Sequence, residues 1–231
     1  MAARNAVAAT EQDIWVILMA SLTRRETLSL LGVAVAGSAA SVVLQRTAPL
    51  GRDVHDNPAA KSILKDTDWP SFGPADADLT VVTFTDYRCP ACLYAAPKLD
   101  EAVAKDGKVR LVYRDWPIFG AQSEEAARAA IAAHLHGRYV AMHKALMASR
   151  VPFTSASIMQ IAAGAGIDTQ RLSADLQSRS EVIARRLARN RLDAARLRLP
   201  GTPGYLIGHL LVVGALQADE FATAFLSARK L

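Results

Sequence analysis

The sequence contains only two cysteines, and this scarcity limits what they can do. Cys89 and Cys92 are separated by two residues, whereas a disulfide framework joins distant parts of a chain. A bridge within this spacing closes too small a loop to stabilise a fold much. A structural zinc site needs four ligands, and His134, His136 and His143 do not complete such a pattern. We therefore expect no metal, place these histidines at the surface or in a groove, and expect the thiols to serve chemistry.

Aromatic residues and clustered positive charge are also scarce. Aromatic residues make up 6% of the chain, and the formal net charge is only +5. No run of Lys and Arg is interleaved with aromatic residues, which argues against a nucleic-acid partner. Internal repeats are absent as well. A chain of 231 residues suits one or two domains with a real core, so function has to be sought in local motifs.

Residues 1–45 have the layout of an export signal. Arg24 and Arg25 are followed by an uncharged run rich in Gly and Ala and then by small residues, the order expected of such a signal. The adjacent arginines resemble a twin-arginine signal. Because Met19 would begin a conventional signal, residues 1–18 are interpreted as a mis-annotated start. Whether the signal is cleaved or retained as a membrane anchor, it predicts a periplasmic or cell-envelope protein, in a compartment where disulfides persist.

Residues 46–61 are predicted to be a linker. They are polar and contain Pro and Gly, which favours turns and irregular chain over a packed element. The folded domain is expected to occupy residues 62–231. Its first stretch, residues 62–69, is expected to contain a short edge strand.

A strand, a helix and a second strand are predicted around the cysteines. The stretch Leu79–Thr85 is β-branched and apolar, as a buried strand is. Helical apolar spacing begins at Ala91 and stops at the Asp-Gly pair of residues 106–107. Residues 108–116 then have the composition of the next strand. This order predicts a parallel βαβ unit with the C-x-x-C where the strand gives way to the helix.

The second half of the domain is predicted to be helical and then to return to strands. Residues 121–198 are rich in Ala, Arg and Leu, and Ser123 is a reasonable N-cap for their first helix. Strand character returns in residues 201–208 and in the LLVVG segment after them, which predicts a hairpin. A final amphipathic helix follows. The fold class is therefore α/β, a thioredoxin-like fold in which βαβ and ββα units flank an inserted helical domain.

Three segments give the chain a resemblance to a known family. They are FTDYRCPAC at residues 84–92, YRDWPIFG at residues 113–120 and GTPGYLIGHLLVVGA at residues 201–215. Together they resemble the DsbA-like family of bacterial thiol-disulfide oxidoreductases. The resemblance covers about residues 62–230. It implies an enzyme that exchanges disulfides with protein substrates through the Cys89-Pro-Ala-Cys92 motif and needs no cofactor.

The predicted position of the motif assigns different roles to the two thiols. Cys89 would lie at the N-terminus of a helix, where unpaired N–H groups and the helix dipole favour a thiolate. In C-x-x-C proteins the first thiol titrates at roughly 3.5–7. Cys92 lies one turn further along the same helix face, so we expect it to be shielded and to act as the resolving thiol. The expected cycle is thiol-disulfide exchange through a mixed disulfide on Cys89.

Three further residues are candidate site residues. The resemblance implies that Pro203 is in the cis form and faces the cysteines. It also implies that the backbone of Thr202 pairs with an extended substrate segment. Asp86, the carboxylate nearest to Cys89 in the sequence, is interpreted as a proton acceptor for Cys92 or a group that tunes the pKa of the pair. The alternatives are a solvated loop acid and a cap of the helix.

The direction of exchange is left open by the motif. Family members noted for strong oxidation carry a histidine where this chain has Ala91, yet net oxidation is favoured here. The alternatives are an isomerase or reductase, and a non-catalytic, chaperone-like module that binds peptides. The expected partners are protein substrates with cysteines and a membrane or soluble redox partner that recycles the pair. Isomerases of this kind often dimerise through an extra N-terminal domain, for which this chain has no room. The protein is expected to be a monomer.

Overall fold

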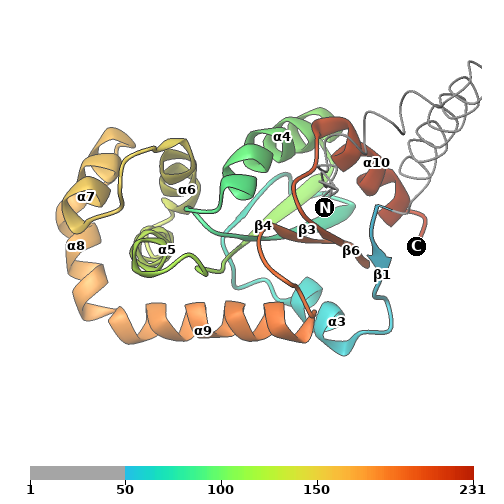
Figure 1. Cartoon of the computed structure of the whole chain (residues 1–231), viewed down its shortest axis with the longest axis horizontal. Helices are drawn as coiled ribbons and strands as arrows, with labels where there is room; N and C mark the ends of the chain where they lie inside the picture. Colours follow the sequence, from blue (N-terminus) through green and yellow to red (C-terminus); the bar gives the residue numbers. More distant parts are fainter. Residues whose placement is uncertain (1–49) are drawn as a thin grey trace, which may run out of the picture. The chain divides into compact units, whose positions relative to one another are not determined.

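A six-stranded mixed sheet organises residues 50–231, the part of the chain that the computed structural model describes (Figure 1). The strand order is β1-β6-β5-β3-β4-β2, and β3 and β4 form the parallel pair. The strands are β1 (Arg52–Asp53), β2 (Ser71–Phe72), β3 (Leu79–Thr85), β4 (Val109–Asp115), β5 (Gly204–Ile207) and β6 (Leu210–Val213). The predicted export signal lies outside the described residues.

Eight helices accompany this sheet in residues 50–231. They are α3 (Pro58–Lys65), α4 (Pro90–Asp106), α5 (Ala121–His134), α6 (Tyr139–Ala148), α7 (Ser155–Gly164), α8 (Thr169–Ser178), α9 (Ser180–Arg196) and α10 (Ala218–Ala228). The predicted βαβ unit is confirmed as β3-α4-β4, and the predicted hairpin as β5 and β6. The order βαβ, helices, ββα is the predicted thioredoxin-like fold.

The central strands separate two hydrophobic cores. Along β3, Val81 faces a core shared with α4 and α10, whereas Val82 and Phe84 face a core shared with α3 and α9. This alternation follows from the two-residue period of a strand. We call the two sides the α4 face and the α9 face of the sheet. Every residue of β3 except Thr80 is buried, because helices cover both sides.

The inserted helices α5–α8 lie beside the sheet, and α9 runs back from them to α3 (Figure 1). The predicted helical block is therefore confirmed. Near the end of α9, the buried Asn190 donates a hydrogen bond to the backbone oxygen of Asp115 at 2.8 Å. One turn later, Asp193 lies 3.8 Å from the guanidinium of Arg114. Two residues of α9 thus hold two adjacent residues of β4.

Three local predictions are wrong. Part of the expected linker is folded, because β1 pairs with β6 and α3 begins at Pro58. The Asn57 side chain accepts a hydrogen bond from the Ala59 amide, and this cap starts a helix where the composition suggested a loop. The edge strand expected within residues 62–69 is β2, at residues 71–72. The N-cap of α5 is Gly120 rather than the predicted Ser123, which lies inside the helix.

No helix within residues 50–231 is both long and apolar enough to cross a membrane.

Candidate active site

Cys89 and Cys92 lie at the start of α4, on the α4 face of the sheet. Cys89 is the N-cap residue and Pro90 begins the helix. The Cys89 carbonyl accepts the amide of Leu93 at 3.0 Å, so the sulfur lies beside the unpaired N–H groups of the first turn. Both residues are free thiols, and both are almost fully buried. The predicted junction of strand and helix is confirmed.

The hairpin loop lies directly against the first cysteine. The Thr202–Pro203 peptide bond is cis, as the resemblance implied. The Cys89 thiol donates a hydrogen bond to the Thr202 carbonyl at 3.3 Å. Residues 113 positions apart in the sequence therefore meet at one sulfur atom. The substrate-binding roles of Thr202 and Pro203 stay predictions.

Cys92 has a different environment. It is 1% exposed, compared with 3% for Cys89. Burial raises the pKa of the Cys92 thiol to about 12, although hydrogen bonds from the Thr85 side chain and the Asp86 backbone partly offset this effect. A cavity of about 10 Å³ lies beside it, lined in part by Cys92, Thr85, Tyr113 and His143. A buried thiol of this kind is strongly favoured in its protonated form.

Asp86 is buried rather than solvated, so the alternative of a solvated loop acid is wrong. Its Oδ1 accepts the Arg88 amide at 2.7 Å and the Ser123 hydroxyl at 2.7 Å. Its Oδ2 accepts the amides of Ile118 at 2.6 Å and Phe119 at 3.0 Å. The bonds from Ile118 and Phe119 tie the cysteine loop to the loop after β4, and the bond from Ser123 ties it to α5. The tuning role predicted for Asp86 stays a prediction.

A buried polar cluster next to the cysteines was not predicted. The hydroxyls of Tyr87 and Tyr139 each donate to Asp115 Oδ1 at 2.8 Å. The Tyr87 hydroxyl also lies 3.0 Å from His143 Nδ1. His143 is only 7% exposed, so it does not lie at the surface, but it lines a groove of about 270 Å³ between α4 and α6, which is one of the two expected positions. We call Tyr87, Asp115, Tyr139 and His143 the tyrosine-aspartate cluster.

Burial dominates the titration of this cluster. It raises the pKa of Asp115 to about 7, against the two tyrosine hydrogen bonds that favour the carboxylate. It lowers the pKa of His143 to about 3, so the imidazole is neutral at physiological pH. The two-residue period of side chains along a strand could have predicted the position of Asp115 from the sequence. It follows Tyr113 by two residues on β4 and pairs in register with Thr85, which places it on the α4 face.

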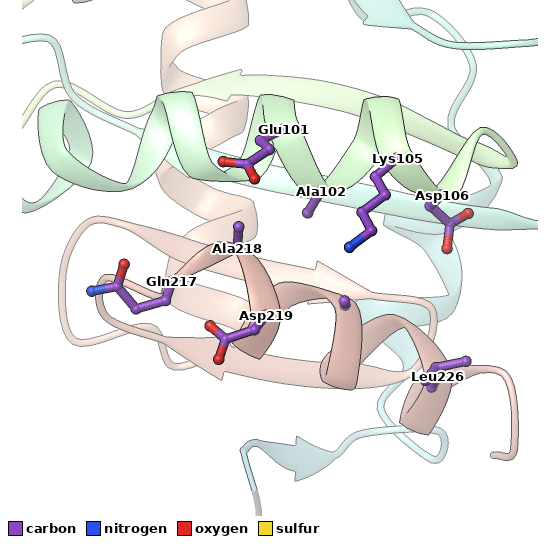
Figure 2. A pocket seen from close by; sticks show the side chains of 9 residues that line it. Glu101, Ala102, Lys105, Asp106, Gln217, Ala218, Asp219 and Leu226 are labelled. Carbon is purple, nitrogen blue, oxygen red and sulfur yellow. The ribbon is translucent and has the colours of Figure 1, made fainter.

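A large pocket lies away from the cysteines. It has a volume of about 680 Å³ and lies between the C-terminal half of α4 and α10 (Figure 2). Charged side chains such as Glu101, Lys105 and Asp219 line it, and no cysteine does. Glu101 is nine residues beyond Cys92, about 14 Å along the helix axis. The pocket is therefore separate from the thiol chemistry.

The site defines a class of protein. Two buried thiols at a helix N-terminus, next to a cis-proline loop on a thioredoxin-like fold, are the features of thiol-disulfide oxidoreductases. Within residues 50–231, no group of three His, Cys, Asp or Glu side chains is placed to hold a metal ion.

Comparison with known proteins gives the family. Residues 80–226 match the DSBA-like thioredoxin domain, and the chain belongs to that family. A thioredoxin-like oxidoreductase from Silicibacter pomeroyi is 36% identical, with a TM-score of 0.69 over 74% of this chain and 98% of that one. The thiol-disulfide exchange protein alpha-DsbA2 from Wolbachia pipientis is 26% identical, with a TM-score of 0.68. The match covers 76% of this chain and 98% of that one. The members of this family are thiol-disulfide oxidoreductases.

Among curated proteins, the chain is similar to part of much longer proteins. It is 31% identical over 159 residues to the Na⁺/H⁺ antiporter NhaA 3 of Salinispora tropica, a match that covers 68% of this chain. The match covers 24% of the antiporter, so the chain spans about a quarter of that relative's length. Proteins of the DsbA-like family act on cysteine-containing protein substrates and are recycled by redox partners.

Proposed function

We propose that this protein is an exported oxidase that forms disulfides in protein substrates through Cys89 and Cys92. One observation supports this most strongly: the Cys89 sulfur lies at the α4 N-terminus, 3.3 Å from the Thr202 carbonyl. A substrate segment that pairs with this backbone would bring its own sulfur to Cys89. The more deeply buried Cys92 would be the leaving thiol when the substrate sulfur attacks Cys89.

The proposed cycle begins with the Cys89–Cys92 disulfide. A substrate thiolate attacks Cys89 Sγ, the bond to Cys92 breaks, and Cys92 leaves as a thiolate that takes up a proton. A second substrate thiolate then attacks the substrate sulfur of the mixed disulfide and releases Cys89 as a thiolate. The substrate loses two electrons and the pair gains them. The recycling partner removes these electrons and restores the disulfide.

Apolar side chains beside the cysteines would hold the substrate. Ile118 and Phe119 are 43% and 51% exposed, although both are large and apolar. Their amides are bound by Asp86, which fixes their loop to the cysteine loop. A Cβ placed on Gly201 would lie 4.0 Å from Ile118 Cδ1. Exposed apolar residues in a group are typical of a binding surface, so this pair would contact an unfolded substrate chain.

Oxidation is the proposed direction, and export is the proposed route. The twin-arginine layout of residues 1–45 favours the periplasm or cell envelope, where disulfides form. The main alternative is an isomerase or reductase that a partner keeps reduced. Because Ala91 replaces the histidine of strong oxidants, the reduction potential decides between them. A value near −120 mV would support oxidation, and a value near −270 mV would contradict it.

The test of the enzyme is the oxidation of a reduced, unfolded protein with glutathione disulfide as oxidant. The wild-type protein is expected to accelerate disulfide formation, and Cys89→Ser to abolish the acceleration. Cys92→Ser is the matched control: it is expected to stop turnover but to accumulate a mixed disulfide on Cys89, visible by mass spectrometry. Unchanged activity of Cys89→Ser would reject the mechanism. Substrate binding without any oxidation by the wild type would favour the chaperone-like alternative.

A further inference from the structure

The buried tyrosine-aspartate cluster lies next to Cys92, yet the cycle above gives it no task. All four of its members are ionisable, and two of them, Asp115 and His143, are nearly inaccessible to solvent. Buried ionisable groups destabilise a fold unless they are compensated. No Lys or Arg of residues 50–231 forms an ion pair with Asp115. Such a group needs an explanation.

We propose that this cluster is a proton relay that carries a proton between Asp115 and Cys92 through Tyr87, His143 and one water molecule. The proposal rests on the assigned role of Cys92 as the buried partner of Cys89. It adds a supply of protons for the step in which Cys92 leaves as a thiolate. Asp115, Tyr87 and His143 are positioning groups in this scheme, because none of them touches the reacting sulfur.

The need for a relay follows from the burial of Cys92. A thiolate released at this position is strongly disfavoured until it is protonated, because burial raises the pKa of Cys92 to about 12. Bulk water does not reach a residue that is 1% exposed. An internal donor that is partly protonated at neutral pH would meet the need. Asp115, with a pKa of about 7, has that property.

The gap between Cys92 and His143 fits one water molecule. The cavity there measures about 10 Å³, close to the smallest volume that holds a water. Cys92, Thr85 and His143, which all have polar side-chain atoms, are among the residues that line it. The Tyr113 hydroxyl, on the same cavity, is buried and has no hydrogen-bond partner in the protein. A buried water needs two to four polar partners, and this lining provides them.

The remaining steps run along hydrogen bonds. Asp115 and the Tyr87 hydroxyl are 2.8 Å apart, and Tyr87 and His143 Nδ1 are 3.0 Å apart. The protonated Asp115 gives its proton to Tyr87 oxygen, Tyr87 gives its own to Nδ1, and Nε2 gives its proton to the water. The water protonates the Cys92 thiolate. Asp115 ends as a carboxylate, and His143 changes tautomer without becoming a cation.

One other carboxyl residue, Asp100, lines the cavity beside Cys92, and it forms an ion pair with Lys144. Asp86 lies near Asp115, and it accepts hydrogen bonds from three amides and the Ser123 hydroxyl. Lys144 follows His143 on α6 and pairs with Asp100 of α4 at 3.5 Å. Lys144 lowers the pKa of His143 further, which favours the neutral imidazole that the tautomer exchange requires. The other thiol near Cys92 is Cys89, which is bonded to substrate in the step concerned.

Two tyrosines provide a matched test. Tyr87 and Tyr139 each donate to the same Asp115 oxygen at 2.8 Å. The Tyr87 hydroxyl alone of the two has a hydrogen-bond contact with His143. Tyr87→Phe and Tyr139→Phe therefore remove equivalent hydrogen bonds from Asp115, but Tyr87→Phe alone interrupts the relay. A purely structural cluster predicts similar effects for the two variants.

The measurement is the rate at which dithiothreitol reduces the oxidised protein between pH 5 and pH 9, followed by quenched flow and alkylation. Each rate is divided by the concentration of dithiothreitol thiolate, and the oxidised pair itself has no thiol to ionise. The corrected rate of the wild type is expected to fall above about pH 7, as Asp115 loses its proton. Tyr87→Phe is expected to be roughly 10-fold slower below pH 7 and to lose this inflection, a modest effect for proton transfer.

The control variants separate the outcomes. Tyr139→Phe is expected to keep the inflection and move it to higher pH, because the Tyr139 hydrogen bond lowers the pKa of Asp115. Asp115→Asn tests the donor directly and is expected to give a slow, pH-independent corrected rate. Equal profiles for the two tyrosine variants, or an inflection that survives in Asp115→Asn, would overturn the relay. A wild-type disulfide that dithiothreitol does not reduce would instead contradict the proposed function.

Discussion

Arg114 and Asp115 are neighbours on β4, and their side chains enter opposite faces of the same sheet. Arg114, on the α9 face, is fully buried and surrounded by compensating groups. Its guanidinium lies 3.7 Å from the centre of the Trp69 ring, 3.5 Å from Asp66 and 3.8 Å from Asp193. Asp115, on the α4 face, has hydroxyl groups as side-chain partners and no cation.

The presence or absence of a cation changes the pKa of the carboxyl group on each face. Burial raises the pKa of Asp66 in part, but hydrogen bonds from Trp69 and the Asp68 amide and the charge of Arg114 hold it below its usual value. Burial without a cation raises the pKa of Asp115 to about 7. An acid with a cation is a fixed charge that joins elements. An acid without one can gain and lose a proton near neutral pH, which suits a site of chemistry.

The largest expected effect comes from removing the cation of the α9 face. Arg114→Met is expected to lower the free energy of unfolding by about 3–5 kcal/mol, because it leaves Asp193 and part of Asp66 buried without this partner. Urea denaturation of the purified protein would measure it. Dithiothreitol should reduce the folded variant at the wild-type rate. A loss below about 1 kcal/mol would show that the α9 face does not depend on this charge.

The second prediction compares the two acids over pH. Asp115 has a raised pKa, so the stability it contributes is present below about pH 4 and is lost as pH rises to about 7. In the wild type, this rise in pH should lower the free energy of unfolding by at most about 4 kcal/mol, and Asp115→Asn should remove that decrease. Asp66 has a lowered pKa, so its contribution is present above about pH 4 and is lost on acidification.

The measurement for this pair is the urea midpoint of each variant between pH 4 and pH 9. Asp115→Asn should gain stability relative to wild type as the pH rises. Asp66→Asn should lose stability relative to wild type at neutral pH and approach it in acid. Shifts of the same sign in both variants would contradict the comparison between the two faces.

Asp86 is an intermediate case, because backbone amides and a hydroxyl compensate it instead of a cation. Asp86→Asn turns one acceptor oxygen into a donor that faces other donors, and we expect it to cost about 1–3 kcal/mol. Exchange with a protein substrate should slow more than exchange with dithiothreitol, because the Ile118–Phe119 loop loosens. Ser123→Ala, which removes one of the four bonds, should cost about 1 kcal/mol. A larger cost for Ser123→Ala than for Asp86→Asn would reject this account.

The smallest effect is expected for a charge pair in solvent. Arg185 and Glu181 lie 3.5 Å apart on α9, and both side chains are largely exposed. Arg185→Gln should change the free energy of unfolding by less than about 0.5 kcal/mol. The same urea measurement serves here. A change comparable to that of Arg114→Met would mean that burial is not what distinguishes these arginines.

The sequence predicts the central elements well because their signals are local. The β-branched run of β3, the Asp-Gly stop after α4 and the strands of the hairpin each depend on neighbouring residues. The linker prediction failed because the Asn57 cap and the pairing of β1 with β6 outweighed local composition.

The tyrosine-aspartate cluster could not be predicted in the same way. Its members come from the loop after β3, from β4 and from α6, and hydrogen bonds between residues far apart in the sequence join them. His143 is followed in the sequence by Lys144, which suggests a surface position. The side-chain period of β4 could have placed Asp115 beside Thr85, but it could not have shown that no cation joins it.

The grip of α9 on β4 has a consequence for how this domain tolerates change. Asn190 and Asp193 hold the backbone of Asp115 and the side chain of Arg114 from a single helical turn. One residue inserted between them would rotate one contact by about 100° around the helix axis. Insertions and deletions should therefore accumulate in the turns that join α6, α7 and α8, where they leave this register intact. Among related proteins, we expect substitutions in α9 to be more common than changes in its length.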